Sequence, residues 1–290
     1  MKTVSTLSTI AFGALAIFGV ISTARAQTLR FCGSVIGADR TVVGCKDKKL
    51  RNVAPLRALT NLQELDLRHS GVNDLSGIAA STTLVKLLLG FTPVRDLTPL
   101  ANLVKLEHLD LRKTLVYDLM PLAKLHALKV LWLDRVLVRD LRPLGRLKRL
   151  ETLFVGRAPV VDLTPLRRSK SLRRLMVVDC DVKDLAPLAK LTRLEGLNLS
   201  RTKVKDLKPL AKLRALRTLR LDETPVEDIA PLARLSKLES LNLAKTKVSD
   251  LKPLFALKKL RRVVLSGTPA LHHSSLVELR SRRPNLRIQR

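Results

Sequence analysis

The chain has 290 residues, a formal net charge of +29 and only 3% aromatic residues. That charge does not specify a fold, but it favours anionic polymers, acidic proteins or a negative membrane surface as partners. Charged residues interrupt every apolar run after residue 26, which excludes a later membrane-spanning segment.

Residues 1–26 have the pattern of an export signal. Lys2 supplies a positive start, "IAFGALAIFGVIS" is an apolar run too short to span a bilayer, and "ARA" places small residues before Gln27. No cysteine stands at this junction, which argues against a lipoprotein anchor. We expect a cleaved signal peptide and a secreted or periplasmic protein, whose net charge is +27 once Lys2 and Arg25 are removed. The alternatives are an uncleaved N-terminal anchor and a cytosolic regulatory scaffold with a spurious signal.

The three cysteines are Cys32, Cys45 and Cys180. An exported chain permits disulfides, and Cys32 and Cys45 lie close together in the one region that departs from the repeat described next. We expect these two to pair and to staple the N-terminal end, because the ends of stacked-repeat proteins need extra support. Cys180 falls in an inward position of a repeat and is expected to be a buried thiol.

Most of the chain repeats every 22 residues without an insertion. Aligned on "L-x-x-L-x-L", the first leucine of the unit stands at positions 62, 84, 106, 128, 150, 172, 194, 216, 238 and 260. An aspartate recurs at 74, 96, 118, 140, 162, 184, 206, 228 and 250, and a proline at 99, 121, 143, 165, 187, 209, 231 and 253. The unit reads L-x-x-L-x-L-x-x-T-x-V-x-D-L-x-P-L-a-x-L-x-x, and its positions are called columns 1 to 22 below.

Each part of the unit predicts a local structure. "LxxLxL" carries apolar residues at alternating positions, which is the period of a strand with one buried face. "DLxPLaxL" begins with a side chain that can cap helical N–H groups, followed by a proline that suits a first turn, and its spacing predicts a short 3₁₀ helix. No single unit can bury its leucines alone, so stacked units must share one core, with parallel strands lining one face.

Whole units such as "LEHLDLRKTLVYDLMPLAKL" (106–125) and "LESLNLAKTKVSDLKPLFAL" (238–257) resemble the leucine-rich repeat superfamily, and within it the 22-residue repeats of the bacterial internalins. The resemblance covers residues 50–270. It implies an α/β solenoid, a horseshoe with a parallel β-sheet on the concave face and short 3₁₀ or helical turns on the convex face. It also implies a surface or secreted module for adhesion and recognition.

The two ends depart from the repeat as caps do. Residues 27–61 hold a degenerate unit, in which "NVAPLRAL" keeps the proline and leucines while "TVVGCKDKK" replaces the strand. Residues 62–270 contain ten full repeats, and residues 271–290 are expected to form a charged helix that closes the open core. A single domain of repeats and caps is the simplest organisation, and we expect a monomer.

Columns 3, 5 and 7 must face solvent on the concave side, because columns 4 and 6 face the core. Column 5 of the middle repeats reads Trp132, Phe154 and Met176, with Val130 and Val178 beside them in columns 3 and 7. Column 8 adds a basic rim of Lys113, Arg135 and Arg157. Exposed apolar patches with polar rims often mark interaction sites, so these eight residues are the candidate site for a protein partner. The alternative is that Trp132 lies flat across its neighbours and only shields the sheet.

A basic stripe is expected on the convex side in column 19. It consists of Lys124, Arg146, Arg168, Lys190, Lys212 and Arg234. Such residues ordinarily form a solvated face. A stripe of one sign nevertheless suggests contact with an anionic polymer or membrane surface, which is the rival hypothesis. Nucleic acid is disfavoured, because the basic columns lack interleaved aromatic residues for base stacking.

The sequence contains no pattern that predicts catalysis. The histidines lack metal-ligand spacing, the column-13 aspartates are expected to act as caps, and no phosphate-binding loop, "GxSxG" or "HExxH" occurs. We therefore expect a non-enzymatic binding protein with no cofactor and no metal site.

Overall fold

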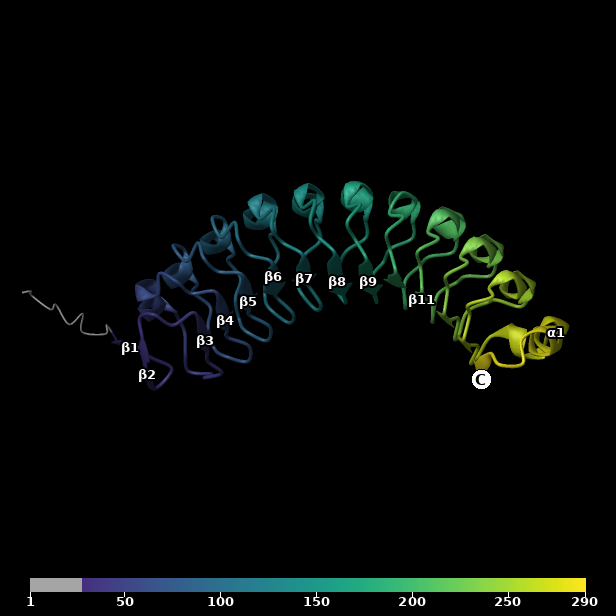
Figure 1. The fold of residues 1–290 in the computed structure, drawn as a ribbon, viewed down its shortest axis with the longest axis horizontal. Coiled ribbons are helices and arrows are strands. Elements are labelled where there is room, and N and C mark those ends of the chain that lie inside the picture. The colour runs from purple at the N-terminus through teal and green to yellow at the C-terminus, as the bar shows by residue number, and fades with distance from the viewer. Residues whose placement is uncertain (1–27) are drawn as a thin grey trace, which may run out of the picture.

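Strands and short 3₁₀ helices alternate along the chain and stack into a curved solenoid (Figure 1). The computed structural model describes residues 28–290, so the expected signal peptide at residues 1–26 lies outside the described residues. One parallel sheet of twelve strands runs through the solenoid in sequence order from β3 to β14. The sheet lines the concave side and the 3₁₀ helices line the convex side, which confirms the expected α/β solenoid.

The elements follow the repeat closely. The strands of the sheet are β3 (Val42–Gly44), β4 (Glu64–Asp66), β5 (Lys86–Leu88), β6 (His108–Asp110), β7 (Val130–Trp132), β8 (Thr152–Gly156), β9 (Arg174–Val178), β10 (Gly196–Asn198), β11 (Thr218–Arg220), β12 (Ser240–Asn242), β13 (Arg262–Val264) and β14 (Arg287–Gln289). The 3₁₀ helices are η1 (Ala54–Ala58), η2 (Ser76–Ile78), η3 (Thr98–Leu100), η4 (Met120–Lys124), η5 (Arg142–Arg146), η6 (Thr164–Arg168), η7 (Ala186–Leu188), η8 (Lys208–Lys212), η9 (Ala230–Arg234), η10 (Lys252–Ala256) and η11 (Pro269–His272).

The leucine columns form one continuous core between the sheet and the 3₁₀ helices. Leu131 of β7 is fully buried and pairs in register with Leu109 on one side and Leu153 on the other. Burying one leucine side chain stabilises a fold by about 1.5–3 kcal/mol. No strand or helix is long, so the stability of the solenoid comes from repeating this burial in every unit.

The column-13 aspartates cap the 3₁₀ helices, as expected. In each of nine repeats the aspartate Oδ1 accepts a hydrogen bond from the backbone N–H two residues later, for example from Thr98 to Asp96 at 2.8 Å. Hydrogen bonds from backbone N–H groups lower the pKa of Asp74 and Asp140 below the ordinary value. These carboxylates are therefore structural.

Column 8, the rim position after each strand, has a left-handed backbone in every repeat. The φ angle lies between 52° at Lys113 and 64° at His69 in the nine non-glycine cases, and is 68° at Gly267. The amide of Lys113 donates to the carbonyl of Asp134 in the next repeat at 2.8 Å, and equivalent bonds recur along the solenoid. This turn ends each strand and directs the chain away from the sheet at the same column.

The N-terminal end of the core is covered by a hairpin and a disulfide. Strands β1 (Thr28–Phe31) and β2 (Ser34–Gly37) pair antiparallel, and a Cys32–Cys45 disulfide with a Cα–Cα distance of 5.9 Å ties them to the end of β3. The expectation that this segment has no strand is wrong. Val43 points inward and is 6% exposed while Val42 is 56% exposed, so "TVVG" supplies enough alternation to pair with β4.

The C-terminal end is closed by α1 (Ser274–Arg282), as expected of a charged helix. Arg283, which follows the helix, donates to the backbone carbonyls of Leu257, Lys258 and Leu260 and so satisfies acceptors at the end of the last repeat. The chain then adds β14 to the sheet, a strand that the repeat pattern does not predict. Among the described residues, no helix has the length and apolar character needed to cross a membrane.

Candidate functional site

Three large side chains line up on neighbouring strands at the centre of the concave face. The register places Trp132 beside Phe154, and Phe154 beside Met176. All three side chains are half-buried, and the rings of Trp132 and Phe154 have centroids 6.3 Å apart with a tilt of 52°. Val130 and Val178, on the same strands, are also half-buried. The structure thus brings the five apolar residues of the candidate site together, with the indole outside the core.

One face of the indole is covered by Arg112. The guanidinium carbon lies 5.6 Å from the ring centroid, within the range of a cation–π contact. Arg112 also makes two hydrogen bonds to Asp110, with Nε at 2.9 Å and Nη2 at 2.7 Å. Asp110 was expected to face solvent in column 5, but it is fully buried, because Arg112 two residues later folds back over it. The indole is therefore held in place by an arginine that sequence analysis did not single out.

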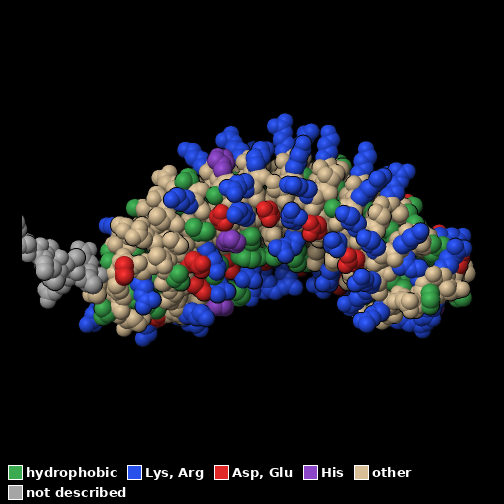
Figure 2. Space-filling model, viewed as in Figure 1, with side chains coloured by type: hydrophobic (Ala, Val, Ile, Leu, Met, Phe, Trp, Pro, Cys, Tyr) green, Lys and Arg blue, Asp and Glu red, His purple; other side chains and the backbone are tan. Residues whose placement is uncertain are grey.

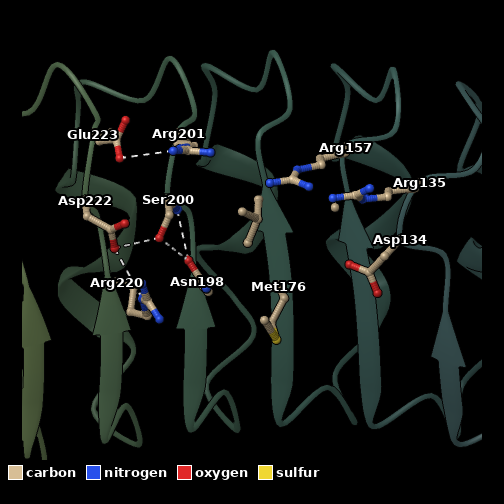
Figure 3. Close-up of a pocket in the computed structure, with 12 residues that line it drawn as sticks. Asp134, Arg135, Arg157, Met176, Asn198, Ser200, Arg201, Arg220, Asp222 and Glu223 are labelled. Carbon is tan, nitrogen blue, oxygen red and sulfur yellow. Dashed lines mark hydrogen bonds and ion pairs between the residues drawn. The ribbon is translucent and has the colours of Figure 1, made fainter. Parts of the chain in front are cut away.

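The basic rim divides into two groups. Arg135 and Arg157 lie side by side above the strands (Figure 3), and Arg157 makes an ion pair with Asp179 at 3.2 Å. Arg135 makes no ion pair within residues 28–290. The Nζ of Lys113, in contrast, lies 4.6 Å from the centroid of the Phe91 ring, at the neighbouring rim position. Lys113 thus contacts a second aromatic residue on the N-terminal side of the candidate site.

The repeats that carry the apolar patch also differ in their turns. In column 9 a buried hydroxyl donates to the column-6 carbonyl; these residues are Ser70, Thr92, Thr114, Thr202, Thr224, Thr246 and Thr268. The three repeats at residues 128–193, called the central repeats below, have Val136, Ala158 and Cys180 there. Their strands β8 and β9 extend to five residues, whereas the other strands of the sheet have three. The Cys180 thiol is buried and free, and burial raises its pKa.

A shallow depression of about 450 Å³ lies between the two arginines of the rim and β11. Asp134 and Met176 lie along it (Figure 3). Burial raises the pKa of the Asp134 carboxyl above its ordinary value, and the charge of Arg112 opposes this rise. A Cβ at Gly156 would lie 2.6 Å from Oδ1 of Asp134, so a larger residue there would displace this carboxylate.

The far side of the depression is a hydrogen-bonded polar network. Asp222 accepts hydrogen bonds from Ser200 at 2.7 Å, Asn242 at 2.8 Å and Arg220 at 3.2 Å. The backbone N–H of Ser200 donates to Oδ1 of Asn198 at 3.0 Å, and the two side chains lie next to each other (Figure 3). Here one carboxylate oxygen, Oδ1, accepts all three hydrogen bonds, whereas Asp134 accepts no side-chain hydrogen bond within the described residues. The concave face therefore changes from apolar to polar between β9 and β10.

The six basic residues of column 19 are all exposed on the convex side, at the ends of the 3₁₀ helices or, for Lys190, two residues after the end. Figure 2 shows lysine and arginine side chains projecting from this side of the solenoid. None of the six takes part in an ion pair within residues 28–290. They form a regular row, one residue per repeat, and do not converge on one point.

Sequence analysis missed residues whose role depends on packing. Arg112, Asp134 and Arg174 become informative only once their contacts are known, since their columns also hold other residue types. Two signals were nevertheless readable. The hydroxyl column is interrupted in three successive repeats, and column 3 contains a single glycine, Gly196. In the described part of the chain, no group of three or more His, Cys, Asp or Glu residues could hold a metal ion.

Comparison with known proteins agrees with the geometry. A family model described as leucine-rich repeats in two copies matches residues 192–234. An internalin (InlF) from Listeria monocytogenes has a similar structure, with a TM-score of 0.74 and 26% identity over 81% of this chain and 77% of that chain. Internalin C2 from the same organism gives a TM-score of 0.58 and 28% identity over 70% of this chain and 80% of that one.

A leucine-rich repeat protein of Leptospira interrogans shares the fold, with a TM-score of 0.65 and 21% identity over 82% of this chain and 75% of that chain. No curated protein matches the sequence. The fold, the repeat and these matches define a leucine-rich repeat protein. Within that class, its repeats are internalin-like.

Proposed function

We propose that the protein is an exported, non-enzymatic recognition module that binds a protein partner through the concave face of its central repeats. Stacked-repeat proteins commonly bind through extended concave surfaces. Internalin-like repeats are binding scaffolds in adhesion and recognition, which supports a binding role over a catalytic one. Export rests on the signal-like pattern of residues 1–26.

The proposal rests mainly on one observation: the central repeats differ from the 22-residue consensus both in column 5 and in column 9. These repeats keep the inward leucines that the fold needs, yet they carry Trp132, Phe154 and Met176 in succession in a column that is polar in five of the other seven repeats. The same three repeats lose the column-9 hydroxyl. The fold needs none of these outward changes, since flanking repeats adopt the same turn with polar residues. An exposed aromatic cluster beside arginine is also the composition of interface anchors.

The contacts of Trp132 favour a binding role over simple shielding. Arg112 and Phe154 hold the indole in one orientation, so little side-chain freedom remains to be lost on binding. The ring remains half-exposed despite these contacts. A residue that only shielded its strand would not need an ordered, partly open ring held by an arginine and a second aromatic side chain.

The test is capture of a partner from an envelope extract by full-length protein, whose mature form is expected to begin at Gln27. Trp132→Ala should reduce the affinity for the captured partner about thirtyfold, the effect of losing an interface anchor worth roughly 2 kcal/mol. Val264→Ala, in the same column at the far end of the sheet, is the matched control and should bind normally. Circular dichroism should show that both variants fold.

Two results would contradict the proposal. One is undiminished capture by Trp132→Ala. The other is capture that disappears when salt is added and does not depend on Trp132, because contacts to an exposed charged stripe are screened by salt while apolar contacts are not. That second result would assign binding to the convex column-19 stripe.

A further inference from the structure

Gly196 leaves a hollow in the concave face. It is the first residue of β10 and lies in column 3, where the other nine repeats carry a side chain. The register places Arg174 and Thr218 on either side of it. Phe154 and Met176 contribute apolar walls to the resulting hollow, whose volume is about 280 Å³. The hollow therefore lies where this column lacks a side chain.

The backbone does not require glycine at this position. Gly196 has no left-handed φ, and a Cβ added there would meet only Cγ of Arg174, at an ordinary contact distance of 3.6 Å. At Gly156, by contrast, an added Cβ would collide with the Asp134 carboxylate. A glycine inside a strand also weakens it relative to residues with a side chain. What Gly196 supplies is open space on the concave surface.

Two arginines, Arg174 and Arg220, lie at the hollow. One is hydrogen-bonded to a neutral side chain, and the other to a carboxylate that has further donors. Nε of Arg174 donates to Oγ1 of Thr152 at 3.3 Å, and Arg174 makes no ion pair within the described residues. Nε of Arg220 donates to Asp222, whose carboxylate also accepts from two other side chains. Each guanidinium carries five N–H donors, so both keep capacity for a further acceptor. The hollow is thus apolar inside and positively charged at its sides.

From these observations we infer that the hollow receives one apolar side chain of an extended, acidic segment of the protein partner. The inference rests on the proposed function and specifies the chemistry of the partner. The volume is at or below the lower limit for pockets that hold small molecules, about 300–1,000 Å³, and it suits a single side chain. The arginines and the excess positive charge of the whole chain supply the complementarity to carboxylates.

The spacing of the arginines fits an extended segment. Arg174 lies one strand from Gly196, about 4.8 Å away, and Arg220 lies one strand away on the other side and two residues further along. In an extended peptide, side chains two residues apart point the same way and are separated by roughly 6.6 Å. Acidic residues two positions before and after the apolar residue therefore come within reach of the two guanidinium groups.

The probe is a fluorescent peptide, Glu-Glu-Ser-X-Ser-Glu-Glu, in which X is leucine or serine, and binding is followed by fluorescence anisotropy with the full chain. The leucine peptide should bind at least tenfold more tightly than the serine peptide, because only leucine gains from apolar burial. Gly196→Val should place a branched side chain in the hollow, obstruct the leucine and abolish the preference for the leucine peptide. Valine is already present in the same column at Val130, and thermal unfolding should show that the variant is at least as stable as the natural chain.

Ser240→Val is the matched control. It introduces valine in the same column two strands from Gly196, at a residue that does not line the hollow, so the preference for the leucine peptide should remain. Arg174→Met should weaken the leucine and serine peptides by the same factor, since it removes the charge and keeps an aliphatic stem at the wall of the hollow. If Gly196→Val folds poorly, Gly196→Thr serves instead, because Thr218 already lies beside it in the column.

Three outcomes overturn the inference. They are equal binding of the two peptides, no binding of either peptide, and a peptide ratio that persists in Gly196→Val. Heparin that displaces both peptides equally, together with a ratio near one, would indicate a nonspecific anion surface. Trp132 does not line the hollow, so Trp132→Ala should leave the ratio unchanged. If Trp132→Ala loses partner capture while Gly196→Val does not change peptide binding, the proposed function stands and the inference about the hollow is wrong. If Trp132→Ala captures the partner normally while Gly196→Val abolishes the preference for the leucine peptide, the proposed role of Trp132 is wrong.

Discussion

The central repeats and the repeats that flank them share a core but differ on the concave surface. In both regions the inward leucines are fully buried and the column-13 aspartates cap the 3₁₀ helices. In the central repeats the hydroxyl turn is lost, two strands lengthen, and column 5 carries three large apolar side chains in succession. Folding explains the shared columns, because every unit needs them to stack. It does not explain the differences, which is why the central concave surface is the candidate site.

The largest expected effect separates core packing from partner binding at two neighbouring residues of β8. Leu153 of β8 is fully buried, and its neighbour Phe154 is half-buried on the concave side. Leu153→Ala should lower the free energy of unfolding by about 2–5 kcal/mol, the range for deleting a buried leucine side chain. Phe154→Ala should cost less stability than Leu153→Ala, because the side chain of Phe154 is only partly buried, but should weaken partner binding. Urea unfolding followed by the fluorescence of Trp132, the single tryptophan, measures the free energy of unfolding with a probe inside the central repeats.

Equal losses of stability in these two variants would show that the outward column is structural. The comparison between central and flanking repeats would then reflect packing alone, and Trp132 would be a shield for the sheet. A matched variant outside the central repeats, Leu241→Ala, should show the same large loss as Leu153→Ala, because Leu241 is equally buried.

A smaller effect on stability is expected from exchanging the column-9 residues, so that a flanking repeat loses its hydroxyl and a central repeat gains one. Oγ1 of Thr202 donates to the carbonyl of Leu199 at 2.7 Å in a buried position. Thr202→Val should therefore lower the free energy of unfolding by about 1 kcal/mol, the net value of one hydrogen bond. Val136→Thr should restore the missing donor in the first central repeat and should be neutral or stabilising. A destabilising Val136→Thr together with a neutral Thr202→Val would show that the hydroxyl does not maintain the turn.

The repeat made the inward and outward positions predictable, because alternation fixes which residues share a face. It also predicted the caps, since a carboxylate beside a proline turn has one obvious set of N–H donors. The left-handed rim could not be read, because column 8 holds His, Phe, Lys, Arg, Asp and Glu and shows glycine only at Gly267. The burial of Asp110 was equally hidden, since it depends on the path of the Arg112 side chain. The hollow at Gly196 depends on neighbours from several strands.

The smallest expected effect concerns the two column-7 aspartates on opposite sides of the depression. Burial raises the pKa of Asp134 above its unfolded value, so its charged form opposes folding at neutral pH. Asp134→Asn should therefore be more stable than the natural chain at pH 7. This advantage should shrink as the pH falls through the folded pKa toward the unfolded value near 4, because the natural carboxyl then becomes neutral as well. Urea unfolding at a series of pH values measures the difference.

Asp222→Asn is the opposing control for this measurement. The Asp222 carboxylate accepts three side-chain hydrogen bonds, one of them from Arg220, so the neutral amide should lower stability at pH 7. If Asp134→Asn and Asp222→Asn change stability in the same direction, the prediction that the two carboxylates have opposite effects on folding is wrong. If they diverge, Asp134 carries a charge that folding does not favour, beside the arginines of the rim. A charge retained against the stability of the fold is what a surface selected for binding would contain.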